Sequence, residues 1–112
     1  MKVFISQPMK GISDEEILSK RNEAISKIKE KFGDDVEIIN SIFDKAESVP
    51  LKCLAKSLML MADADYVYFI NGSEYSRGCA IEYICSNNYG IRNNINETRY
   101  QNDKWESISE GF

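Results

Sequence analysis

Two carboxylates, several hydroxyls and two glycines follow one apolar segment of this chain. Residues 66–70 are apolar, residues 71–78 form a polar loop, and Glu82 follows about one turn into the helix expected next. Paired carboxylates such as Glu74 and Glu82 suit glycosidic chemistry, because one attacks an anomeric carbon while another acid protonates the leaving group. The loop hydroxyls, an arginine and free backbone N–H groups at a helix start are the usual ingredients of an anion site. The alternative for Glu82 is a solvated glutamate on a helix surface.

The composition excludes several kinds of chemistry. The chain contains no histidine, which removes Ser-His-Asp and Cys-His catalysis together with the commonest metal ligand. Cys53, Cys79 and Cys85 form no CxxC pair, and neither a GxGxxG nor a GxxxxGK[ST] sequence occurs. We therefore expect no metal and no cofactor. The net charge of −4 argues against nucleic-acid binding, which needs a basic face.

Length and hydropathy indicate one soluble domain. The chain has 112 residues, of which 43% are apolar and 29% charged, typical of a globular protein with a single core. No stretch approaches the roughly 20 apolar residues of a membrane span. The amino terminus leads directly into a strand without a signal-peptide pattern, so we expect a cytoplasmic protein without membrane partners.

Strand and helix patterns alternate along the first 90 residues. β-prone segments at 2–6, 36–39 and 66–70 alternate with helical patterns at 13–32, 48–62 and 76–89. This order predicts right-handed βαβ units and a single-domain three-layer α/β/α sandwich, with a flavodoxin- or Rossmann-like parallel sheet of about four strands. Residues 91–112 lose the pattern, and we expect them to be an extension that packs on the domain or on a partner subunit.

Capping residues mark the ends of the helices. Ser13 begins a capping box with Glu16, Ser48 precedes a proline at a helix start, and Ser76 can cap the third helix. The apolar stripe of the second helix is expected to be core, and its members are Leu51, Leu54, Ala55, Leu58, Met61 and Ala62.

Ligands of an open parallel sheet collect at the carboxyl ends of its strands. This edge should gather residues 6–11, 40–43 and 71–82, whereas Asp63 and Asp65 precede a strand and lie at the opposite edge. Arg21 is on the inward stripe of the first helix, where a buried guanidinium must find an anion. Its partner is either a structural carboxylate or a ligand, and the sequence leaves both open.

Three segments resemble a known family. They are residues 3–11 (VFISQPMKG), the apolar strand entered from Ala64 and Asp65, and residues 76–83 (SRGCAIEY). They are similar to the nucleoside 2-deoxyribosyltransferase superfamily, and most of all to small phage and bacterial proteins of the domain of unknown function family 4406. The resemblance covers residues 1 to about 90, which form the expected deoxyribosyltransferase-like domain.

The resemblance implies roles for individual residues. Glu82 matches the nucleophile that forms a covalent (deoxy)ribosyl ester, and Ser76 matches the phosphate-contacting serine of the 2′-deoxynucleoside 5′-phosphate N-hydrolases. Phe4 falls where the family often has a tyrosine, and Ser57 where active members carry an aspartate that helps to bind and protonate the base. With the residues of the functional edge, the expected binding set is Ser6, Gln7, Met9, Gly11, Arg21, Ser57, Ser76, Arg77, Gly78 and Cys79.

The sequence therefore predicts an N-glycosidase, either a hydrolase or a deoxyribosyltransferase, acting on a nucleoside 5′-monophosphate or a related nucleotide. Glu82 would attack C1′, with Glu74 as the second carboxylate. The alternative is a non-catalytic protein of the same fold that senses or sequesters a nucleotide. The resemblance further implies a homodimer or a higher homo-oligomer.

Overall fold

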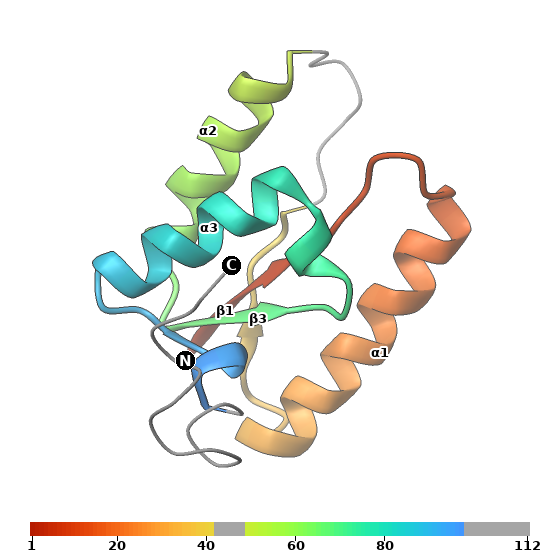
Figure 1. Cartoon of the computed structure of the whole chain (residues 1–112). Coiled ribbons are helices and arrows are strands. Elements are labelled where there is room, and N and C mark those ends of the chain that lie inside the picture. Colours follow the sequence, from red (N-terminus) through yellow and green to blue (C-terminus); the bar gives the residue numbers. More distant parts are fainter. Residues whose placement is uncertain (42–48, 98–112) are drawn as a thin grey trace.

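A four-stranded parallel sheet forms the centre of the structure, a computed structural model that describes residues 1–41 and 49–97 (Figure 1). Its strands lie in the order β2-β1-β3-β4. Their bounds are Lys2–Ser6 for β1, Glu37–Ile38 for β2, Tyr66–Phe69 for β3 and Arg92–Asn93 for β4. In the central pair, Val3 is opposite Tyr66 and Ser6 is opposite Phe69, so β1 and β3 end together at one edge of the sheet.

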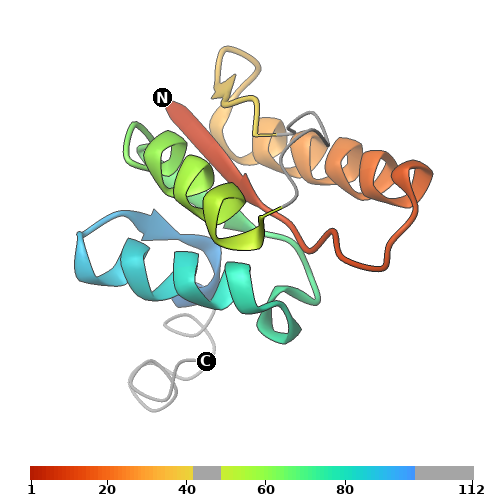
Figure 2. The same cartoon turned by 90° about the horizontal axis from the view of Figure 1, so that it is seen from above.

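Helices cover both faces of the sheet, which confirms the predicted α/β sandwich. Helix α1 (Asp14–Phe32) lies on one face, while α2 (Pro50–Met61) and α3 (Arg77–Asn88) lie on the other (Figure 2). Side chains alternate along each strand. In β1, Val3 and Ile5 therefore pack under α1, whereas Phe4 packs with the cluster under α2 and α3.

The predicted N-terminal capping residues of α1 and α3 are confirmed. Ser13 Oγ accepts a hydrogen bond from Glu16 N at 3.2 Å, and Ser76 Oγ accepts one from Cys79 N at 3.4 Å. Helix α1 ends before Gly33, whose φ of 99° is in a region that favours glycine. These local signals fix where α3 begins, and so fix Glu82 in its second turn.

Helix α2 differs from the prediction in its cap and its burial. Val49 occupies its N-cap and makes no side-chain capping bond, and Ser48 lies outside the described residues. Met61 alone of the predicted stripe is buried; Leu54 and Leu58 are half-buried, whereas Leu51, Ala55 and Ala62 are exposed, Leu51 by 73%. A helix of 12 residues is about 18 Å long, and its first turn projects past the sheet edge (Figure 1). The stripe therefore meets the core only towards its carboxyl end.

The fourth strand lies beyond residue 90, within the segment expected to be an extension. Asn93 is buried, and its Nδ2 donates to Ser86 Oγ at 3.2 Å and to Asn87 Oδ1 at 3.0 Å. The Asn94 amide binds both Phe69 N (2.7 Å) and Phe69 O (3.0 Å), as the backbone of a neighbouring strand would. Residues 91–97 are thus part of the domain, whereas residues 98–112 lie outside the described part of the chain.

Candidate functional site

A hydrogen-bonded pair, Ser6 and Glu82, lies where β1 ends and α3 begins. Ser6 is the last residue of β1 and faces α3, as the alternation from Phe4 requires. Its Oγ donates to Glu82 Oε1 at 2.6 Å, and both side chains are buried, with Glu82 only 6% exposed. Among the described residues no hydrogen bond reaches Glu82 Oε2. The carboxylate thus has one oxygen fixed and one without a described partner.

Burial changes the protonation of this carboxyl group. Desolvation raises the pKa of Glu82 from 4.5 to about 7, while the hydrogen bond from Ser6 lowers it. Burial disfavours the charged form, whereas a donor favours it. Glu82 therefore changes its charge near neutral pH, as expected of a group poised for chemistry.

Three serine hydroxyls surround Cys79 at the same end of the sheet. Ser6, Ser76 and Ser73 each lower the pKa of the Cys79 thiol. Burial is the main cause that raises the pKa of Cys79, and the charge of Glu82 adds to it. The thiol is therefore neutral at physiological pH and lines the site as a small polarisable group rather than a nucleophile.

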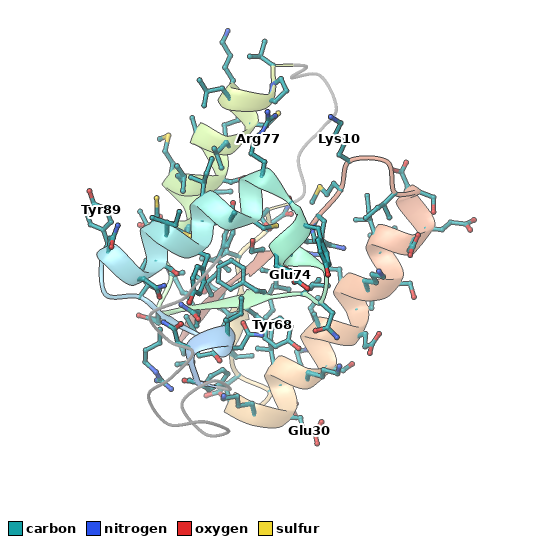
Figure 3. The ribbon with its side chains drawn as sticks, viewed as in Figure 1. Lys10, Glu30, Tyr68, Glu74, Arg77 and Tyr89 are labelled. Carbon is teal, nitrogen blue, oxygen red and sulfur yellow. The ribbon has the colours of Figure 1, made fainter. Side chains whose placement is uncertain are left out.

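Two exposed cations lie at the end of the molecule where α3 begins. Figure 3 shows Lys10 on the β1–α1 loop and Arg77 in the first turn of α3, both at the same end of the molecule. Both side chains are exposed. An ideal Cβ on Gly78 meets nothing nearer than Leu54 Cδ1 at 4.0 Å, so the fold itself does not require glycine there. The amino end of α3 thus offers positive charge and an open approach to its backbone.

The β1–α1 loop contributes Gln7 and leaves Met9 and Gly11 exposed. Gln7 Nε2 donates to Ile17 O at 2.7 Å, whereas its Oε1 is buried and meets no donor among the described residues. Gly11 has a φ of 77°, which a glycine adopts at little cost. This loop is therefore fixed to α1 through Gln7, with its tip in solvent.

Arg21 is buried on the α1 side of the sheet. Its guanidinium donates to Ile39 O at 3.1 Å and to Ser41 Oγ at 3.3 Å. Of the two partners left open by the sequence, a structural carboxylate is absent among the described residues. Burial lowers the pKa of Arg21 from its usual value.

Two expected site residues, Glu74 and Ser57, have no described interaction with Glu82. Glu74 is exposed on the short helix η1 (Ser73–Tyr75), and among the described residues neither a hydrogen bond nor a charge effect connects it to Glu82. Ser57 is half-buried on α2, with no described hydrogen bond to Glu82. Of the binding residues expected from the sequence, those brought together around Glu82 are Ser6, Ser76 and Cys79, with Arg77 and Gly78 beside them at the amino end of α3.

The structure adds two serines that the sequence did not single out. Ser73 Oγ lies within hydrogen-bonding distance of Ile70 O and of Ser6 O, which joins the ends of β3 and β1. Ser41 Oγ donates to Ile5 O at 3.4 Å and accepts from Arg21. For both, the signal available in the sequence was a serine in the segment that follows a strand. Residues 42 and 43, which also belong to the expected functional edge, lie outside the described residues.

A separate cavity of about 240 Å³ lies between α1 and β3. Tyr68 and Ile70, which line it, pack under α1, on the face opposite Glu82. Within residues 1–41 and 49–97, no cluster of three His, Cys, Asp or Glu residues is arranged to hold a metal ion. No helix in that part of the chain is long and apolar enough to cross a bilayer.

Comparisons with models of protein families, with curated proteins and with solved structures find no match to this chain. The fold and the site define a parallel α/β domain with a buried carboxylate at the carboxyl edge of its sheet.

The raised pKa of Glu82 predicts how stability depends on pH. The folded protein keeps the Glu82 proton between pH 4.5 and 7 while the unfolded chain loses it, so this contribution is complete below pH 4.5 and disappears as pH rises to 7. Relative to Glu82→Gln, the wild type should lose roughly 3 kcal/mol of unfolding free energy over this range. Urea denaturation at several pH values measures the difference.

Glu74→Gln is the matched control, because Glu74 is exposed and should follow the wild-type curve. Parallel curves for the wild type and Glu82→Gln would show that Glu82 titrates normally.

Proposed function

We propose that this protein is a nucleotide N-glycosidase, acting as a hydrolase or a deoxyribosyltransferase on a nucleoside 5′-monophosphate or a related nucleotide. The observation that carries the proposal is the buried Ser6–Glu82 pair at the carboxyl edge of the sheet. The resemblance of residues 3–11 and 76–83 to the nucleoside 2-deoxyribosyltransferase superfamily supports it.

Glu82 acts as the nucleophile in this proposal. Its Oε2 attacks C1′, the N-glycosidic bond breaks with its electron pair going to the base, and a ribosyl ester forms. Ser6 holds Oε1 and favours the ionised carboxylate. Water or an acceptor base then attacks C1′ of the ester and restores the carboxylate. Because Glu74 is exposed and has no described interaction with Glu82, the departing base takes its proton from solvent in this proposal.

The phosphate binds at the amino end of α3. Backbone N–H groups at a helix start and the helix dipole favour an anion. Ser76 caps this end, and Arg77 adds an exposed cation. The anion and the reacting carboxylate are thus held by consecutive turns of one helix.

A non-catalytic nucleotide-binding protein is the second candidate. It is favoured by the pKa of about 7, which leaves Glu82 substantially protonated at neutral pH, and by the exposure of Glu74. Such a protein retains a nucleotide without cleaving it. In either case the resemblance implies a homo-oligomer of phage or bacterial origin, and the exposed Leu51 and Met59 on α2 offer apolar surface for subunit contact. A cytoplasmic location remains the expectation from the sequence, which shows no signal-peptide pattern.

Chromatography of free base over a panel of ribo- and deoxyribonucleotides tests the reaction. The wild type should release base from at least one 5′-monophosphate, with a rate that rises as Glu82 ionises towards pH 7 and above. Glu82→Gln should lower that rate at least a thousandfold, on the order expected for loss of a nucleophile. Glu74→Gln should retain most of it.

A panel with no base release, combined with an intact nucleotide recovered from the denatured protein, would favour the binding protein. Equal release by the wild type and Glu82→Gln would contradict the assigned nucleophile.

Substitution of Gly78 by alanine tests the anion site separately from folding. The added methyl group fits the fold and improves helix propensity, so stability should stay equal or rise by about 0.5 to 1 kcal/mol. The same methyl group narrows the approach to the backbone of α3, so nucleotide affinity should fall at least tenfold, which calorimetry measures. Unchanged affinity would place the phosphate elsewhere.

A further inference from the structure

Arg21 carries a buried positive charge without a described counter-charge. The side chain is 6% exposed, and its two hydrogen-bond acceptors, Ile39 O and Ser41 Oγ, are both neutral. Within residues 1–41 and 49–97, no carboxylate forms an ion pair with it. Among the described residues, the donors of the guanidinium are therefore satisfied in part, and both acceptors are neutral.

A structural tether does not need that charge. Burying an ion without a partner costs several kcal/mol, whereas a neutral amide can donate to the same two oxygens without this penalty. The chain keeps an arginine at a position where glutamine would connect α1 to the end of β2. A buried guanidinium whose described acceptors are both neutral is suited to bind an anion.

The guanidinium lies next to the proposed reaction centre. Ser41 Oγ bridges Arg21 Nη1 and Ile5 O, and Ile5 directly precedes Ser6 in β1. Ile5 faces α1 and Ser6 faces α3, so Arg21 and Glu82 approach the end of β1 from opposite faces of the sheet. The amino end of α3, where the phosphate is proposed to bind, lies on the same face as Glu82. Arg21 therefore offers a second anion-binding position, on the opposite face of the sheet.

A second polar atom without a described partner lies on the same stretch of α1. Gln7 is fixed to Ile17 O, one turn before Arg21, while its buried Oε1 meets no donor among the described residues. A buried acceptor without a donor costs roughly 1 to 3 kcal/mol. Arg21 and the residue that holds Gln7, Ile17, are thus one helical turn apart on α1, and among the described residues the cation lacks a counter-charge and the acceptor lacks a donor.

We infer that Arg21 is the receptor for an anionic group of the ligand, on the α1 side of the end of β1, and that Gln7 Oε1 accepts from a hydroxyl or amine beside that anion. This inference rests on the proposed function and specifies the substrate further. The substrate carries a second anionic group besides the phosphate bound at the amino end of α3. The chemistry required is an oxyanion such as a phosphate, which a guanidinium binds through paired N–H donors.

Titration of the wild-type protein with inorganic phosphate tests this inference by NMR. The side-chain Nε–H resonance of Arg21, assigned through its absence in Arg21→Gln and Arg21→Lys, should shift and saturate. The shift should persist in Gly78→Ala, which narrows only the α3 site. Affinity for phosphate at this place should fall at least tenfold in Arg21→Gln, as expected for loss of a charged hydrogen bond.

An Arg21 resonance that stays still while phosphate is raised to saturation of the α3 site would overturn the inference. So would a shift that disappears in Gly78→Ala, because the response would then belong to α3. Base release is measured on the same preparations. A saturable Arg21 shift without base release would contradict the proposed reaction and support Arg21 as an anion receptor. Base release without any Arg21 shift would support the reaction and contradict the anion receptor.

Discussion

The hydrogen bond from Ser6 Oγ to Glu82 Oε1 is the interaction on which the site depends. It joins the end of β1 to the second turn of α3, two elements 76 residues apart in sequence, and it holds a carboxylate that burial would otherwise leave neutral. Around this bond the fold separates two faces: the amino end of α3 lies on one, and Arg21 on the other.

Much of this arrangement follows from local sequence. Apolar segments alternate with capped helices, and this order predicts the parallel sheet. Each of these signals involves only a few neighbouring residues, so it can be identified in the sequence. Ser76 caps α3 as expected, and the cap sets the helical phase that turns Glu82 inward. Gly33 ends α1 for an equally local reason, its left-handed backbone. The place of Glu82 after the third strand made it a candidate in the sequence, with a solvated surface glutamate as the alternative; its burial in the structure excludes that alternative.

The remaining features depend on tertiary contacts that no local pattern contains. Asn93 and Asn94 have low strand propensity, and β4 exists because their amides find partners on α3 and β3. The apolar stripe of α2 predicts burial, but the length of the sheet decides how much of the helix meets the core. Glu74 is close to Glu82 in sequence, yet η1 turns it to solvent. Among the described residues the two carboxylates, which the sequence made candidates for a catalytic pair, therefore show no interaction with each other.

Covalent trapping tests the central claim, that Glu82 attacks the sugar, most directly. A 2′-fluorinated nucleoside 5′-monophosphate slows the formation and breakdown of a ribosyl ester, since fluorine destabilises positive charge at C1′, and a good leaving group restores formation. After incubation, intact mass spectrometry should show one added fluororibosyl phosphate, and peptide mapping should place it on Glu82, with none on Glu82→Gln. An adduct on another residue, or a bound analogue without any adduct, would contradict the account.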